Sequence, residues 1–163
     1  MAISGSNGYT GGGLDVPYGI AIDSSGAVWI TNNGGADDKL SNAGAPLSGT
    51  GGFTGGGAAG ARQIAIDGAG NAWTADFAYF TASEFSNSGV ALSPSGGFQG
   101  GGALYYPAGI AIDGSGNAWM INQGNLGSLA ELVGVAVPVI TPICAGLPAT
   151  PTANGTSNLG TRP

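Results

Sequence analysis

Apolar side chains in this chain occur in short runs, each bounded by polar or glycine-rich turns. Ile20 and Ile22 are β-branched residues at alternate positions, and a second apolar run around Trp29 follows after Asp23 and Gly26. A two-residue period is typical of a β-strand. An Asp-x-x-Gly link is typical of a tight turn, because Asp can cap the turn's N–H groups and Gly adopts a positive φ. No segment keeps the three- and four-residue spacing of a helix. The pattern predicts β-hairpins.

The same hairpin pattern occurs three times, in residues 19–32, 63–76 and 109–122. Its tryptophans lie 44 and 46 positions apart, at Trp29, Trp73 and Trp119. Two further motifs recur at about the same spacing. An aromatic residue begins a glycine run at 9–13, 53–57 and 98–102, and a polar–apolar motif follows at 39–44, 84–89 and 131–134. Four short strands per repeat of this length are typical of a β-propeller blade. The equivalent tryptophans are expected to fill the spaces between blades.

We therefore predict an all-β fold of three four-stranded propeller blades, covering residues 8–52, 53–97 and 98–135. A proline-rich tail follows at 136–163, because proline lacks a ladder donor and favours extended chain. The apolar first half of the tail is expected to pack on the outside of the propeller or across a dimer seam, and its end to be loosely ordered. Cys144 lies in this tail, where a buried structural thiol is expected.

Two segments, 17–32 and 107–122, resemble the repeats of the NHL family, which includes propellers related to virginiamycin B lyase. The resemblance implies a propeller fold of about six blades. Lyases of that type use a catalytic histidine with a bound magnesium ion, whereas this chain contains no histidine. The lyase activity is therefore not carried over from the resemblance.

Three blades would make half of such a ring and leave two open apolar flanks. The chain starts with an outer-strand motif at 8–13 and finishes on a third strand near Val133. A second copy, related by a two-fold axis, would complete the ring by exchange of the outer strand. We predict a homodimeric six-bladed propeller. A competing and compatible interpretation is the C-terminal half of a longer, exported bacterial protein.

Charge and composition narrow the function classes. Only three basic residues oppose nine acidic ones, and the net charge of −6 argues against a nucleic-acid partner, which needs clustered cations. The absence of histidine removes Ser-His and Cys-His nucleophiles. No apolar run is long enough to predict a membrane span, and the N-terminus carries no signal-peptide pattern. The sequence does not predict where this chain is located, but its composition is typical of a piece of a longer protein that is exported or extracellular.

Carboxylates in the loops after the tryptophan strands are the candidate functional residues. Asp37 and Asp38 lie in the first of these loops, and Asp76 begins the second. Asn32, Asp76 and Asn122 share one repeat position, so dimer symmetry would double them into a ring of oxygen ligands. Such a ring suits a divalent cation, with Ca²⁺, Mg²⁺ or Zn²⁺ as candidates. The alternative is that these side chains are merely solvated.

Two function classes stay open. The first is a binding or scaffold module with its ligand site at the central funnel, for a small molecule or a carbohydrate. The second is a metal-assisted hydrolase or lyase, in which Asp76, Asp37 or Asp38 holds a cation that activates water. A metal-free variant would use two carboxylates as acid and base on a sugar. Tyr79, Phe80 and the pair Tyr105–Tyr106 could line such a pocket.

Overall fold

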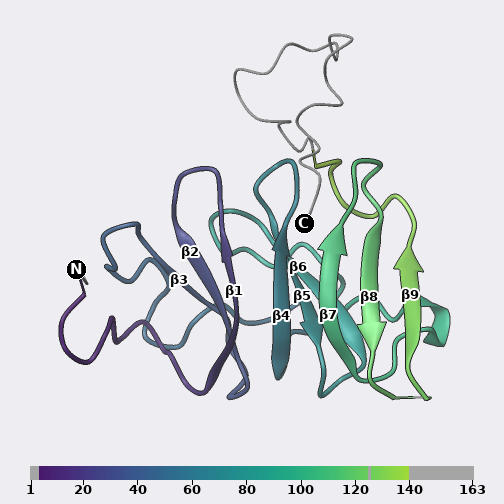
Figure 1. Cartoon of the computed structure of the whole chain (residues 1–163), viewed down its shortest axis with the longest axis horizontal. Helices are drawn as coiled ribbons and strands as arrows, with labels where there is room; N and C mark the ends of the chain where they lie inside the picture. Colours follow the sequence, from purple (N-terminus) through teal and green to yellow (C-terminus); the bar gives the residue numbers. More distant parts are fainter. Residues whose placement is uncertain (1–3, 125, 140–163) are drawn as a thin grey trace, which may run out of the picture.

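The computed structural model describes residues 4–124 and 126–139, so most of the proline-rich tail, with Cys144, lies outside the described residues. Within them the chain forms three three-stranded antiparallel sheets in sequence order (Figure 1). We call them blade 1, blade 2 and blade 3. Their strands are β1 (Pro17–Ile22), β2 (Val28–Asn32), β3 (Asp38–Leu40), β4 (Ala61–Ile66), β5 (Ala72–Asp76), β6 (Thr81–Phe85), β7 (Pro107–Ile112), β8 (Ala118–Asn122) and β9 (Ser128–Leu132). A single 3₁₀ turn, Gly100–Gly102, is the helical element of the described chain.

The Asp-x-x-Gly turns form as the sequence predicts. Asp23 Oδ1 accepts hydrogen bonds from the backbone N–H groups of Ser25 and Ala27, at 2.9 and 3.1 Å. Its Oδ2 accepts a hydrogen bond from Trp29 Nε1 at 3.1 Å. Asp67 and Asp113 repeat this arrangement in the other two blades. Each turn is thus joined to the tryptophan of its own returning strand.

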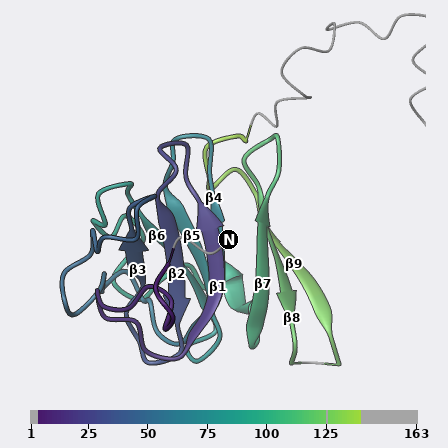
Figure 2. The same ribbon diagram turned by 60° about the vertical axis from the view of Figure 1, so that its left-hand side comes forward.

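The first strands of the three blades, β1, β4 and β7, contact one another in series, and the remaining strands extend away from them (Figure 1). In Figure 2, the sheet of β7, β8 and β9 diverges from the other two. Gly19 permits the close approach of β1 to β4, because a Cβ there would lie 2.7 Å from the Arg62 carbonyl oxygen. This convergence of inner strands is the arrangement of a propeller around its axis.

The predicted fourth strand is reduced to isolated bridges, which corrects the four-stranded blades of the sequence analysis. In blade 1 these bridges pair Leu40 with Pro46 and Asp37 with Phe53. Blade 2 has the equivalent bridges, Phe85 with Ala91 and Ala82 with Phe98. Proline and positive-φ glycines interrupt these segments, so a continuous ladder does not form.

The start of the tail lies over the turns of two blades. Ala136 N–H donates to the Gly116 carbonyl at 3.0 Å, and Val137 N–H donates to Asp67 Oδ2 at 3.2 Å. Gly68 N–H donates to the Val137 carbonyl at 3.0 Å. Residues 136–139 therefore join blades 2 and 3 at their Asp-x-x-Gly ends, and in the described chain they add no fourth strand to blade 3.

Side chains from neighbouring blades form one core at each seam. The first seam, between blades 1 and 2, is filled by Trp29, Ile64, Ala72 and Phe85. The second seam, between blades 2 and 3, holds Ala82, Leu104, Ala118, Met120, Ala130 and Leu132. Trp73 also lies there, stacked on Phe98 with ring centroids 5.2 Å apart.

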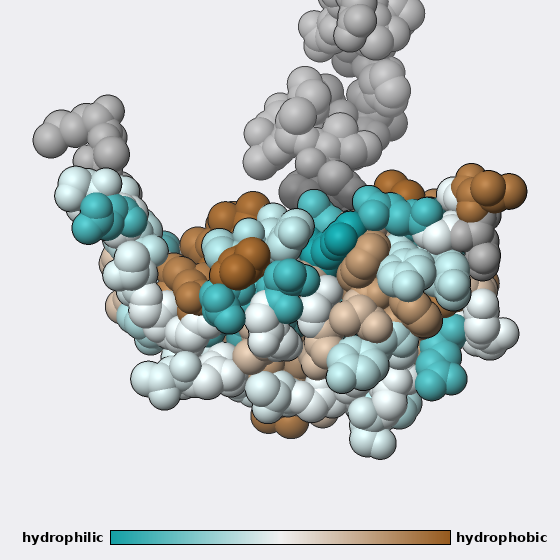
Figure 3. Space-filling model, turned by 90° about the horizontal axis from the view of Figure 1, so that it is seen from below, coloured by the Kyte–Doolittle hydropathy of each residue, from teal (hydrophilic) through white to brown (hydrophobic). Residues whose placement is uncertain are grey.

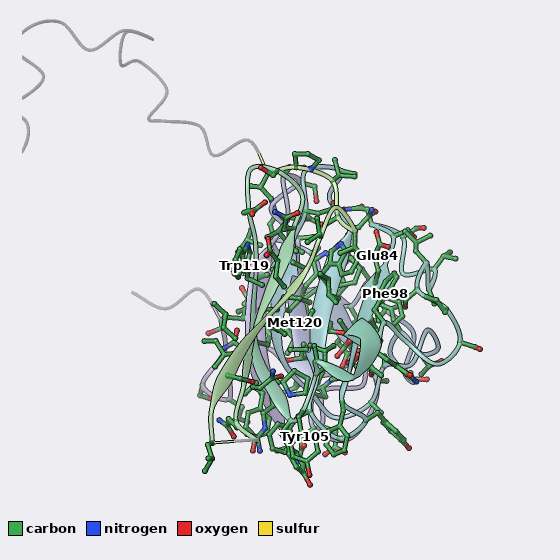
Figure 4. The ribbon with its side chains drawn as sticks, turned by 90° about the vertical axis from the view of Figure 1, so that its right-hand side faces the viewer. Glu84, Phe98, Tyr105, Trp119 and Met120 are labelled. Atoms are coloured by element: carbon green, nitrogen blue, oxygen red, sulfur yellow. The ribbon has the colours of Figure 1, made fainter. Side chains whose placement is uncertain are left out.

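The prediction that tryptophans fill the inter-blade spaces is confirmed for Trp29 and Trp73, which are fully buried. Trp119 is partly exposed, because no blade of the described chain covers its side of β8. Figure 4 shows Trp119 and Met120 on opposite faces of blade 3, with Met120 on the side of Phe98.

Candidate functional site

Asn32 and Asn122 are buried structural residues of their own blades. Asn32 Oδ1 accepts the Asp15 N–H at 3.2 Å, and Asn122 Oδ1 accepts the Tyr105 N–H at 3.0 Å. Their amide groups donate to Ala36 O and Asp38 Oδ2 in the first case, and to Ala103 O and Ser128 Oγ in the second. These bonds tie the loop before each inner strand to the end of the tryptophan strand. In the described chain, every hydrogen bond of these two side chains stays within one repeat.

Asp76 occupies the same repeat position in blade 2 and is also fully buried. Its carboxylate accepts hydrogen bonds from Ser83 Oγ at 2.6 Å, Thr74 Oγ1 at 3.0 Å and Thr81 Oγ1 at 3.4 Å. Burial raises the pKa of Asp76 to about 7, and these hydrogen bonds offset only part of that effect. Asp76 therefore differs from its two neutral equivalents in being a buried carboxyl group whose ionised form is costly at this position.

The adjacent residues Asp37 and Asp38 differ in their hydrogen bonding. Asp38 Oδ1 accepts a hydrogen bond from Ser48 Oγ at 2.7 Å, and its Oδ2 accepts one from Asn32. Asp37 is fully buried, and neither of its carboxylate oxygens has a hydrogen-bond partner. Burial raises the pKa of Asp37 well above its ordinary value, and the charges of Asp76 and Asp38 add to this.

Asp37 belongs to blade 1, and Asp76 lies at the end of β5 in blade 2. All three predicted candidates, Asp37, Asp38 and Asp76, have an exposed fraction of 0%. A substrate in solution does not contact these side chains in this conformation. Among residues 4–124 and 126–139, no group of three or more Cys, Asp and Glu side chains is placed to hold a metal ion.

A different cluster lies where the inner strands begin, and it centres on Arg62. The Arg62 guanidinium lies 3.3 Å from the ring centroid of Phe77 and 5.7 Å from that of Tyr18. Its Nη1 donates a hydrogen bond to Gln123 Oε1 at 2.8 Å. Arg62 thus contacts residues of all three blades. In the part of the chain that is described, no carboxylate forms an ion pair with it.

A backbone irregularity directs these side chains. The register between the first two strands of each blade shifts at Pro17/Ile20, Ala61/Gln63 and Pro107/Gly109. A bulge of this kind redirects the side chain that it contains. Tyr18, Arg62 and Ala108 lie in these irregular stretches.

An aromatic group continues from Phe77 into the loops of blades 2 and 3. Tyr106 packs against Phe77 at 4.9 Å and against Phe80 at 4.5 Å between ring centroids, and Tyr105 packs against both Phe80 and Tyr106. The structure thus brings together three of the four predicted pocket residues, with Tyr105 at the lower end of the molecule in Figure 4. Tyr79 is mostly exposed beside them.

Arg62 was missed as a site residue by the sequence analysis. Its signal is a position in the repeat, since it stands where the neighbouring repeats have Tyr18 and Ala108. Aligning the three repeats shows a charged residue at this position only in the second repeat. The alignment alone does not place Phe77 or Gln123 beside it, because those contacts cross between strands and blades.

Both outer sheet faces of the described chain carry exposed apolar side chains. On blade 1, Ile20 and Ile22 are 66% and 57% exposed, and we call this side the open front face. On blade 3, the open back face holds Trp119, Ile121 and Leu129, which line a hollow of about 550 Å³. Seen from below in Figure 3, hydrophobic residues occur mainly in the upper half of the view, with hydrophilic residues between them.

A solved structure with a TM-score above 0.5 supports the propeller fold. A solved gluconolactonase from Xanthomonas campestris matches 77% of this chain and 46% of its own, with 12% identity and a TM-score of 0.55. Virginiamycin B lyase from Staphylococcus aureus matches 72% and 41%, with 19% identity and a TM-score of 0.45. A streptogramin B lyase matches 80% and 57%, with 17% identity and a TM-score of 0.44.

At these identities the likeness concerns the fold alone. The chain spans about half the length of these solved structures. No protein-family model matches the chain, and no curated protein matches it. In the described residues, no helix has both the length and the hydropathy that a membrane span requires.

Proposed function

We propose that this chain is a β-propeller binding module that acts as half of a six-bladed ring, completed by a second copy. The proposal is supported by the repetition of seam faces at the two ends of the chain. Ile20 has the repeat position of Ile64, which packs against Trp29 at the first seam. Trp119 has the repeat position of Trp29. The open front face and the open back face therefore correspond to the two faces that meet at the first seam, and they lie on the first and the last blade of the described chain.

The shapes and polarity of the open faces favour this assembly. The isoleucines of the open front face project from β1, whereas the open back face is hollowed beside Trp119. Exposed apolar faces of this kind mark protein–protein contacts. A front-to-back contact made twice closes a two-fold ring of six blades, twice the three sheets of one chain.

Molar mass in solution tests the ring. We expect light scattering to give twice 15.6 kDa for the intact chain. Ile121→Arg should yield a folded monomer, because it places a charge in the hollow of the open back face. Val90→Arg is the matched control, since Val90 is 61% exposed on an outer turn, as Ile121 is 59% exposed on β8. A monomeric intact chain would contradict the ring, as would a dimer unaffected by Ile121→Arg.

Arg62 is our candidate for the ligand site at the central funnel. Aromatic rings with a few polar groups are typical of small-molecule sites. Here Tyr18, Phe77 and Gln123 surround a guanidinium without an ion-pair partner in the described chain. This arrangement suits an anionic small molecule, such as a sugar acid.

A matched pair of sugars tests the ligand class. We expect glucuronate to raise the melting temperature of the dimer more than glucose does. Arg62→Met should remove the difference, because it keeps an apolar stem over Phe77 and deletes the charge. Equal responses to both sugars, or a glucuronate response that survives in Arg62→Met, would argue against an anion site at Arg62.

A further inference from the structure

The first seam contains polar residues where the second seam contains apolar ones. Asp37 has the repeat position of Ala82, since their backbone bridges to Phe53 and Phe98 are equivalent. Ala82 is part of the apolar core of the second seam. Asp37 thus projects from blade 1 toward blade 2, at a position where the second seam is packed with only the methyl group of Ala82.

The other wall of the first seam, on blade 2, also has polar residues where the corresponding wall of the second seam, on blade 3, has apolar ones. Thr74 on β5 has the repeat position of Met120 on β8, and Ser83 on β6 has that of Ala130 on β9. Thr74 and Ser83 both hydrogen-bond to the Asp76 carboxylate. The polar residues therefore occur as a set on both walls of one seam.

This set contains two buried carboxyl groups that form no ion pair in the described chain. These fully buried carboxyl groups, Asp37 on blade 1 and Asp76 on blade 2, lie on the two walls of this seam. Of the described basic side chains, Lys39 is bound to Asp23 and Asn87, and Arg62 lies against Phe77 and Gln123. A buried carboxyl group without a partner either keeps a proton or pairs with a cation.

We propose that Asp37 and Asp76 bind a Ca²⁺ ion in the first seam, where the ion joins blade 1 to blade 2. Both Asp37 oxygens lack a hydrogen-bond partner and are free to bind it. Ca²⁺ accepts carboxylate, hydroxyl and backbone carbonyl oxygens in a flexible geometry, whereas Mg²⁺ demands a near-ideal octahedron and retains waters. A seam with two carboxylates and the Thr74 hydroxyl suits Ca²⁺. The ion has a structural role, because these carboxylates are closed off from solvent.

Thermal unfolding of the intact chain after treatment with a chelator tests the site. At about pH 8, saturating CaCl₂ should raise the melting temperature by about 5 °C or more, since an ion that binds only the folded state stabilises it. Elemental analysis of the dialysed protein should find about one Ca²⁺ per chain.

Asp37→Ala is the decisive variant. It should fold, because alanine is the residue at the equivalent position in blade 2. It should also lose both the Ca²⁺-induced rise in melting temperature and the bound ion. Glu131→Ala is the control, because it removes an exposed carboxylate of blade 3 and should keep the full response.

Two outcomes would overturn the proposal. The first is an intact chain that binds no Ca²⁺ and is stabilised only by acid, which would mean that the carboxylates share a proton. The second is a Ca²⁺ response that persists in Asp37→Ala. The site lies within one chain, so the response should also persist in the monomer made by Ile121→Arg. The inference therefore does not depend on the ring.

Discussion

Replacing Asp76 with asparagine should stabilise the metal-free protein by about 4 kcal/mol at about pH 8 and flatten its dependence on pH. The folded carboxyl titrates near 7, whereas 3.8 is the ordinary value. Between these pH values the folded state keeps a proton that the unfolded chain has lost. Stability is therefore highest below the unfolded pKa and falls as the pH rises through 7.

Urea unfolding in chelator, across the range from about pH 4 to pH 8, measures this effect. Asparagine fits the site, because Asn32 and Asn122 occupy it in the other blades. A residual slope of the same sign is expected from Asp37, whose pKa is also raised by burial. Asp15→Asn, at an exposed carboxylate, should leave the profile unchanged. An intact chain that is most stable at about pH 8 in chelator would contradict the prediction.

Lys39→Met should cost about 3–5 kcal/mol, because it leaves the Asp23 carboxylate buried without its cation. Lys39 Nζ lies 2.8 Å from Asp23 Oδ2, and the two side chains are only 6% and 0% exposed. The ammonium also donates to the Asn87 carbonyl at 2.8 Å and lies 4.6 Å from the Trp29 ring centroid. The substitution thus removes a bond within blade 1 and a bond across the first seam.

The Asp23 carboxylate explains why the loss should exceed that of a surface ion pair. Burial raises its pKa, but hydrogen bonds from Lys39, Ser25, Trp29 and Ala27 hold the pKa well below its usual value. The charged form is therefore the stable one in the fold. In a urea titration, Lys39→Met combined with Asp23→Asn should cost less than the sum of the two single losses, because the two side chains interact directly. A single variant within about 1 kcal/mol of the parent would instead indicate a pair of surface strength.

The strands and turns of this protein could be predicted because their signals are local. An alternating run such as Ile20–Ile22 with a capping Asp23 specifies a hairpin wherever it occurs. The fourth strand could not be predicted correctly, because its pairing competes with positive-φ glycines and with proline at Pro46. Whether such a segment forms a ladder or single bridges depends on the sheet that it meets.

The candidate site was predicted in part. The sequence marked Asp37, Asp38 and Asp76 as unusual loop carboxylates, but solvation and burial look alike in a sequence. Their burial arises from the packing of blade 1 on blade 2. That contact joins residues about 40 positions apart, so no local spacing records it. The same is true of Arg62 and Gln123, which meet across blades.

The sequence by itself determined the period of the chain, its hairpins and the packing role of Trp29 and Trp73, because each repeat carries its own hydrophobic pattern and turn residues. Only the tertiary structure decided which exceptions to the repeat meet. Asp37 and Asp76 are polar exceptions on separate blades, and packing brings them to one seam. That packing makes the ionised form of each carboxyl group unfavourable, because a carboxylate is costly only after neighbouring blades have excluded water from it.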